Sequence, residues 1–176
     1  MRSRGNRSSV VIATKVAKLE TRPGLSAKNI KAACDDSLRR LQTDYIDLYY
    51  AHQDDLDTPI EETLQAFDSL VKAGKVRHIA ASNFSAERLA SSLEISAKNG
   101  LARYVAAQDH YNVLERGYEN SLRPTLEKFG LSQIPYFGLA RGFLTGKYRS
   151  GTTVESVRAA GVAAYQNDRE IGRAHV

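Results

Sequence analysis

The chain has 176 residues, and its 42% hydrophobic and 26% charged content is ordinary for one soluble globular domain, which excludes a disordered chain. The net charge of +5 is scattered among acidic residues, unlike the one-sided basic stripe of a nucleic-acid-binding protein, so we expect no nucleic-acid partner. No apolar run has the length of a membrane span or a signal peptide, so we expect no membrane partner and a cytoplasmic location.

The chain contains a single cysteine, Cys34. One cysteine excludes an internal disulfide and a cysteine-rich zinc site, and we expect no bound metal. Cys34 falls within the apolar pattern of a predicted helix, so we interpret it as a small core residue. The mildly basic charge would still favour a small anionic ligand such as a dinucleotide phosphate.

Two strands with a helix between them are predicted in the first third of the chain. The strands are the short β-rich runs Val10–Thr14 and Tyr45–Tyr50. Between them, Ser26 can cap a helix with its hydroxyl. The apolar positions of this helix follow the helical period and predict one buried stripe, made of Ile30, Ala33, Cys34, Leu38 and Leu41.

The second predicted helix has clear boundaries at both ends. Thr58, Pro59 and Glu61 resemble a capping box with proline at the first helical position. Gly74 supplies a left-handed end. The apolar face of this helix consists of Ile60, Leu64, Phe67 and Val71.

Three further strands and two helices complete the pattern. The strands are predicted at Val76–Ala81, Tyr104–Gln108 and Ile134–Gly138. A third helix is predicted at Ser85–Asn99 and ends at Gly100. A fourth is either kinked at Pro124 or begins near it, because proline is disfavoured inside a helix.

Alternating strands and helices predict parallel strands joined by right-handed crossovers. No G-x-G-x-x-G turn follows any strand, which argues against a dinucleotide-binding Rossmann domain. We therefore predict an α/β fold, a partial (β/α)8 TIM barrel with about five parallel strands and intervening helices. Five strands cannot close an eight-stranded ring, so further strands are expected beyond this chain.

Three regions are expected along the chain. Residues 1–150 would form the central portion of the barrel. Residues 151–170 would begin the next helical segment, with a helix within Val154–Asn167. Residues 171–176 can be back-translated into a sequence resembling a common sequencing-library adapter, so we expect them to be non-native and assign no function to them.

In a (β/α)8 barrel the chemistry lies at the carboxyl ends of the strands. The first predicted strand ends near Lys15 and the second near His52. The third ends at Ser82 and Asn83, and the fourth at Gln108. A lysine or histidine in such a place is by itself more often a solvated or structural group, but their succession on consecutive strands favours a functional role.

Five sequence motifs follow the predicted strands in order: VVIATK, YIDLYYAH, GKVRHIAASNF, AAQDHYN and GLARGFLTGKY. Over roughly Gly5 to Arg149, this set resembles the aldo-keto reductase family. The resemblance implies NADPH-dependent reduction of an aldehyde or ketone to an alcohol, with a small-molecule carbonyl substrate. It names neither the substrate nor the oligomeric state.

The resemblance implies catalytic roles for two residues. The family uses an Asp, Tyr, Lys and His tetrad, in which Lys15 matches the lysine that lowers the pKa of the tyrosine and His52 matches the histidine that positions the carbonyl. The family's Asp and Tyr lie upstream, and the residues before Lys15 contain neither. The proton donor is therefore expected outside this chain, which should be inactive alone.

The resemblance also implies a binding site for NADPH (NADP+). Ser82, Asn83 and Gln108 match residues that bind the nicotinamide carboxamide, and Tyr136 matches the aromatic residue that stacks on the nicotinamide ring. The loop that wraps the pyrophosphate would comprise Phe137, Gly138, Leu139, Ala140, Arg141, Gly142, Leu144 and Lys147. Phe137 and Gly138 depart from the family's usual serine and proline. The segment that binds the adenosine 2′-phosphate would lie beyond residue 176.

Two alternative functions remain open at this point. Some relatives, such as potassium-channel β-subunits, use this barrel to bind a partner and sense the cofactor. That branch typically has asparagine where this chain has His52, which favours a reductase. An unrelated barrel enzyme acting on a phosphorylated sugar would fit the fold but would leave the ordered Lys15 and His52 unexplained.

Overall fold

The computed structural model describes residues 5–149, 154–157 and 159–165. The chain divides into two compact units. One consists of Met1–Gln108 with Ser121–Ile134, and the other of Asp109–Asn120 with Pro135–Val176. The tail expected to be non-native, residues 171–176, lies outside the described residues.

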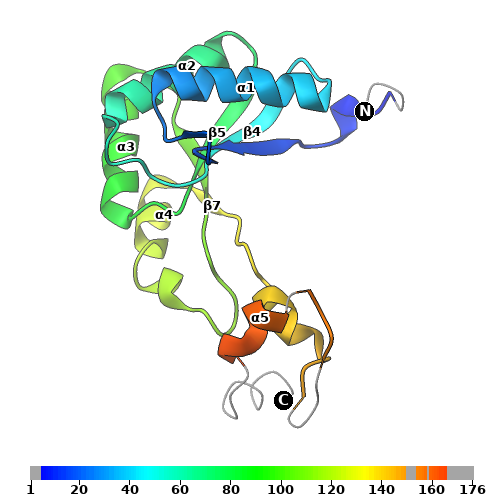
Figure 1. The fold of residues 1–176 in the computed structure, drawn as a ribbon. Coiled ribbons are helices and arrows are strands. Elements are labelled where there is room, and N and C mark those ends of the chain that lie inside the picture. Colours follow the sequence, from blue (N-terminus) through cyan, green and yellow to red (C-terminus); the bar gives the residue numbers. More distant parts are fainter. Residues whose placement is uncertain (1–4, 150–153, 158, 166–176) are drawn as a thin grey trace. The chain divides into compact units, whose positions relative to one another are not determined.

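The first unit contains a five-stranded parallel sheet with the order β1-β4-β5-β6-β7. Its strands are β1 (Ala13–Val16), β4 (Ile46–Ala51), β5 (Val76–Ser82), β6 (Tyr104–Gln108) and β7 (Ser132–Gln133). The intervening helices are α1 (Ala27–Leu41), α2 (Ile60–Lys72), α3 (Ala86–Asn99) and α4 (Arg123–Phe129). Figure 1 shows α1, α2 and α3 lying along one side of the sheet. This confirms the predicted α/β fold with five parallel strands, as in part of a (β/α)8 barrel.

The two faces of the sheet carry different side chains, because successive residues of a strand point to opposite sides. On the helix side, the Tyr49 ring packs edge-on against Phe67 of α2 with centroids 5.5 Å apart. The other face carries a buried cluster of Tyr50, Ala80 and Ala106. Lys15 pairs in register with Tyr50, and so belongs to this second face.

The pairing of β5 with β6 contains one irregularity. Ile79 pairs with Tyr104, whereas the next residue, Ala80, pairs with Ala106. Val105 is therefore an extra residue in β6, a β-bulge. Tyr104 accordingly lies on the helix side, 6.3 Å from Phe67, while Ala106 belongs to the opposite face.

Most of the predicted helix boundaries are confirmed. The Ser26 hydroxyl accepts the Asn29 N–H at 3.3 Å at the start of α1, and Ser85 caps α3 in the same way. α3 ends at Gly100 with a left-handed φ, and α4 begins beside Pro124 rather than kinking at it. Within α1, burial raises the pKa of the Cys34 thiol to about 11, which fits a core residue.

Two predictions near the start of the first unit are wrong in detail. The strand expected at Val10–Thr14 is β1, Ala13–Val16, so Lys15 lies within the strand. Pairing with β4 starts only at Ala13, and Val11 is 80% exposed. The capping box at Thr58 does not form, because the Thr58 hydroxyl donates to Asp55 instead. Pro59 is the N-cap residue of α2, and no side chain caps the helix.

The strand expected at Ile134–Gly138 is also wrong. β7 is the two-residue strand Ser132–Gln133. The Ile134 N–H still donates to the Ala107 carbonyl at 2.9 Å. Beyond Pro135 the pairing continues as an isolated bridge between Tyr136 and His110, and not as a continuous strand. A short antiparallel hairpin of β2 (Lys18–Leu19) and β3 (Arg22–Pro23) was not predicted.

The second unit is built from short helical segments. It contains 3-10 turns at Gly117–Glu119 and Ala140–Thr145, followed by α5 (Ala159–Val162) and a 3-10 turn at Ala163–Tyr165. The helix expected within Val154–Asn167 is thus confirmed only for its middle, and residues 158, 166 and 167 lie outside the described part. The core of this unit consists of Ala140, Phe143, Tyr148, Val162 and Tyr165. Within the described parts of the chain, no helix is long and apolar enough to cross a membrane.

Candidate active site

Four of the predicted site residues share one face at the carboxyl edge of the sheet: Lys15, His52, Ser82 and Gln108. Ser82 pairs directly with Gln108 across β5 and β6. His52 follows Ala51, the last residue of β4, and its backbone N–H donates to the Val16 carbonyl at 2.9 Å. The register therefore brings the ends of β1, β4, β5 and β6 together, as predicted for a barrel rim.

Lys15 lies above a buried tyrosine. Its Nζ is 5.3 Å from the centroid of the Tyr50 ring and donates a hydrogen bond to Oε1 of Gln108. Burial lowers the pKa of Lys15, and the nearby charge of Lys18 lowers it further. The Lys15 charge is thus held in a partly desolvated place, where it acts strongly on neighbouring ionisable groups.

His52 is half-buried in the same place. Burial lowers the pKa of its imidazole below the ordinary value of 6.5, and the positive charges of Lys15 and Lys18 lower it further. The imidazole is therefore neutral at pH 7, with one nitrogen that donates a hydrogen bond and one that accepts.

Asn83 connects the ends of β4 and β5. Its Nδ2 donates to the His52 carbonyl at 2.8 Å and to the Ser82 hydroxyl at 3.0 Å, and its backbone N–H donates to the Gln108 carbonyl at 3.3 Å. Asn83 adopts a left-handed φ of 56°, a conformation that asparagine tolerates better than most residues. Hydroxyl and amide groups at one edge form a donor and acceptor set that fits a carboxamide.

A cavity of about 340 Å³ opens beside Lys15 and His52, between β1, the β2–β3 hairpin and α1. Its lining combines apolar and polar residues with several positively charged side chains, and none of its lining residues within the described chain is acidic. A cavity of this charge favours an anionic or electron-rich ligand. The basic lining residues are Lys15, Lys18, Arg22 and Arg40.

The second unit carries the remaining predicted residues. The Tyr136 ring stacks on His110, with centroids 5.4 Å apart and planes inclined by 11°. Phe137 has a φ of 56°, and its carbonyl accepts a hydrogen bond from Asn112 Nδ2 at 3.0 Å. A left-handed phenylalanine is uncommon, so this turn is strained and is held by its neighbours.

The loop from Gly138 to Lys147 is partly folded on itself. The N–H groups of Ala140 and Gly142 donate within the loop, to carbonyls at 2.7 and 2.8 Å. They are already bonded, so the exposed cations Arg141 and Lys147 are the clearer anion-binding groups here. Leu139 is exposed, whereas Ala140 is buried and Leu144 is half-buried against the core of this unit.

Two residues that contribute to the site, Tyr50 and Lys18, were not predicted from the sequence. Tyr50 forms the support beneath Lys15, and its period-two spacing from His52 was a signal that both lie on one face. Lys18 lies on the unpredicted hairpin, and its charge reaches both Lys15 and His52. No spacing rule places a two-residue hairpin beside a strand end.

Comparison with known proteins adds an independent finding. A family model described as "Aldo/keto reductase family" matches residues 1–175. The chain is 37% identical to the aldo-keto reductase YhdN of Bacillus subtilis over 86% of its length, and 38% identical to the mouse aflatoxin B1 aldehyde reductase member 2 over 80%. It is also 37% identical, over 83% of its length, to a putative voltage-gated potassium channel subunit beta of Schizosaccharomyces pombe. The matches span 45%, 38% and 44% of these relatives, so the chain covers less than half of each.

Proposed function

Because the chain belongs to the aldo/keto reductase family, we propose that the whole protein reduces an aldehyde or ketone to an alcohol with NADPH. The observation that carries the proposal is the convergence of Lys15 and His52 with Ser82 and Gln108 on one edge of the sheet. The names of the YhdN and aflatoxin aldehyde reductase relatives support carbonyl reduction.

We propose that Lys15 lowers the pKa of the proton donor through its charge. The family's donor is a tyrosine upstream of the lysine, in a part of the protein outside this chain. A cation in a partly desolvated place favours the ionised form of a neighbouring hydroxyl, which brings the donor's pKa closer to neutral. The neutral His52 imidazole would hold the substrate carbonyl oxygen by a hydrogen bond.

NADPH supplies a hydride when it is bound. Ser82, Asn83 and Gln108 would bind its carboxamide, and Tyr136 would pack against the nicotinamide ring. The loop Phe137–Lys147 would bind the pyrophosphate, with the charges of Arg141 and Lys147 contributing more than the bonded N–H groups of Ala140 and Gly142. The whole protein would act as a cytoplasmic enzyme on a small carbonyl compound.

Of the alternatives, family membership excludes the unrelated sugar-phosphate barrel. A cofactor-sensing subunit is not excluded by likeness alone, since the fission-yeast channel subunit is as similar as the reductases. His52 favours the reductase, because the channel-subunit branch typically has asparagine there.

The test is to assay the full-length protein with a panel of aldehydes and ketones while NADPH oxidation is followed, with NADH in parallel. Turnover with NADPH that is lost in Lys15→Met supports the proposal. Tight NADPH binding without turnover of any carbonyl would instead favour the cofactor-sensing subunit. We expect the 176-residue chain alone to be inactive, because the residues before Lys15 include no tyrosine and the outer edges of β1 and β7 have no partner strand in the described sheet.

A further inference from the structure

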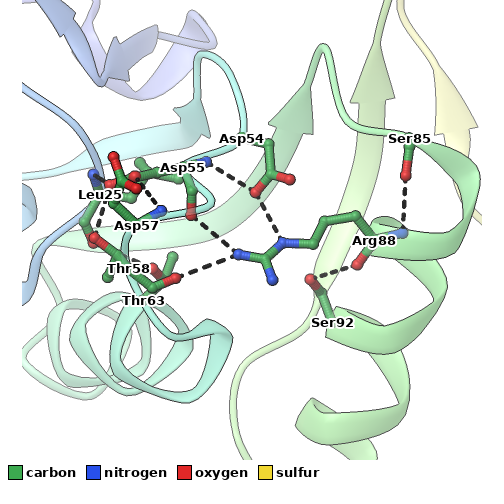
Figure 2. A network of polar contacts seen from close by, with 9 residues as sticks. All are labelled: Leu25, Asp54, Asp55, Asp57, Thr58, Thr63, Ser85, Arg88 and Ser92. Carbon is green, nitrogen blue, oxygen red and sulfur yellow. Dashed lines mark hydrogen bonds and ion pairs between the residues drawn. The ribbon is translucent and has the colours of Figure 1, made fainter.

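A second feature of the carboxyl edge is a network of polar contacts centred on Asp55 (Figure 2). Oδ2 of Asp55 accepts the Leu25 N–H at 2.6 Å and the Thr58 hydroxyl at 2.7 Å. Oδ1 accepts the Asp57 N–H at 3.1 Å. Asp55 therefore ties the segment before α1 to the loop that leads from β4 into α2.

Arg88 extends this network to the first turn of α3 (Figure 2). Its Nε donates to Oδ1 of Asp54 at 3.0 Å, and its Nη2 donates to the carbonyls of Asp55 at 3.0 Å and Thr58 at 3.3 Å. Both members of the Arg88–Asp54 ion pair are largely buried, with exposed side-chain fractions of 22% and 17%. We call Asp54, Asp55, Thr58 and Arg88 the carboxyl-edge network.

The three segments joined in this way carry proposed site residues. The segment before α1 is held to the end of β1, because the Gly24 N–H donates to the Ala17 carbonyl at 2.9 Å. The β4–α2 loop begins at His52, and α3 begins just after Asn83. The loop that holds Asp54 and Asp55 is therefore continuous with the backbone that carries the imidazole.

The contact between the loops is tight. A Cβ on Gly24 would lie 2.7 Å from Oδ2 of Asp55, and Gly24 has a φ of 84°. Burial by itself would raise the pKa of Asp55, but the bonds from the Leu25 N–H and the Thr58 hydroxyl outweigh it, and the pKa is lowered overall. Asp55 is thus ionised at neutral pH and accepts from all its donors.

We infer that the carboxyl-edge network positions His52 and Asn83 for catalysis, an inference that rests on the function proposed above. The network acts through geometry. The groups that shift the pKa of His52 are its burial, Lys15 and Lys18, and no member of the network is among them. Misplacement of a reacting group by about 1 Å can slow a reaction about a hundredfold.

The experiment compares two aspartates of the full-length enzyme. In Asp55→Asn, an amide NH₂ replaces an acceptor and faces an N–H or hydroxyl donor, so the loop must shift. Asp47→Asn is the matched control. Asp47 also accepts a backbone N–H, from Ile12 at 2.9 Å, and binds arginines, but it lies at the opposite end of β4.

We expect Asp55→Asn to lower kcat by about ten- to a hundredfold without moving the acid limb of the pH profile, and Asp47→Asn to leave kcat per folded enzyme unchanged. Equal losses in both variants, no loss in Asp55→Asn, or a shifted acid limb would overturn the inference. If Asp55→Asn does not fold, Thr58→Val removes one bond to Asp55 and should lower kcat in the same direction by less. An unchanged kcat in Thr58→Val would then overturn it.

A second measurement separates this inference from the proposed function. In NMR spectra, the imidazole resonances of His52 should move in Asp55→Asn and stay in place in Asp47→Asn. If the wild-type enzyme reduces no carbonyl, the proposed function fails and with it the catalytic part of the inference. The resonances then still decide whether the network positions His52, and resonances that stay in place would show that it does not.

Discussion

The two ends of strand β4 hold charged side chains in opposite ways. At the amino end, the buried Asp47 carboxylate binds Arg7 at 2.7 Å and Arg77 at 2.8 Å. The two guanidinium groups also lie 3.7 and 4.0 Å from the centroid of the Tyr45 ring. Both positive charges there share one carboxylate as their partner, an arrangement that fixes a structure without leaving a reactive group.

On the cavity side of the carboxyl end, like charges gather instead. Lys15 and Lys18 both lower the pKa of His52, and no acidic side chain of the described chain lines the cavity beside them. Gathered like charges cost stability, and groups with shifted pKa values cluster at functional sites. The contrast fits a strand that serves stability at its amino end and, in the function proposed above, chemistry at its carboxyl end.

The largest expected effect comes from Lys15→Met at the carboxyl end. We expect kcat for carbonyl reduction to fall by about 10²–10⁴-fold, because the proton donor loses the charge that lowers its pKa. Cofactor affinity should change little, as measured by titration with NADPH. Lys18→Met, which removes a charge from the same cavity, is the control and should retain most turnover. A wild-type kcat in Lys15→Met would contradict the proposed role of the carboxyl end in the chemistry.

Asp47→Asn at the amino end should show the converse. We expect the free energy of unfolding to fall by about 1–3 kcal/mol, because the buried Ile12 N–H and the largely buried Arg7 lose a charged acceptor. Chemical denaturation of the full-length protein measures this change. Turnover per folded molecule should stay at the wild-type level. A loss of turnover without a loss of stability would show that the amino end also serves chemistry.

Gly24→Ala tests how tightly the carboxyl-edge network is packed. The left-handed backbone of Gly24 costs an alanine about 1–2 kcal/mol, and its new Cβ would also press on Asp55. Gly130→Ala is the matched control, because Gly130 has a φ of 64° but nothing within 4 Å of a built Cβ. Thermal unfolding should show a greater loss for Gly24→Ala. Equal losses of stability would mean that the Asp55 side chain moves away from the new Cβ without destabilising the protein.

The smallest effect is the titration of His52. The pKa of His52 is lower in the folded protein than its ordinary value of 6.5 in the unfolded chain. Near this pH the folded protein therefore binds fewer protons than the unfolded chain. The stability that His52 contributes is therefore fully present above pH 6.5 and is lost as the pH falls through the lower folded pKa. NMR titration should place this pKa below 6.5, and Lys15→Met should raise it. A pKa that stays unchanged in Lys15→Met would show that the two charges do not interact.

The fold was predictable where local signals were strong. The Ser26 cap and the end of α3 at Gly100 follow from local chemistry, and they are confirmed. The start of β1 and the extent of β7 depend on where their partner strands begin and end, which neither segment encodes by itself. The Thr58 cap was mispredicted because the neighbouring Asp55 carboxylate accepts its hydroxyl.

The candidate site was predictable to the level of strand ends. Lys15, His52 and Gln108 do meet at one edge, because parallel register is set by the repeated strand and helix pattern. Their roles stay predictions. The Lys15 bond to Gln108 could not be foreseen, since it depends on side-chain packing across two intervening strands.

The extra residue Val105 decides which way Gln108 points. In an uninterrupted ladder from Ile79 and Tyr104, side chains of β6 with even numbers would all belong to the helix side, Gln108 included. Because of the extra residue, the side chains after Tyr104 exchange faces of the sheet. Gln108 therefore lies beside Ser82 and within reach of Lys15. If the unchanged sequence paired without this bulge, every proposed site residue would remain, yet the Gln108 amide would point toward the helices. Deleting Val105 would instead let Ala106 follow Tyr104 in regular alternation, and Gln108 would stay on the face of Lys15.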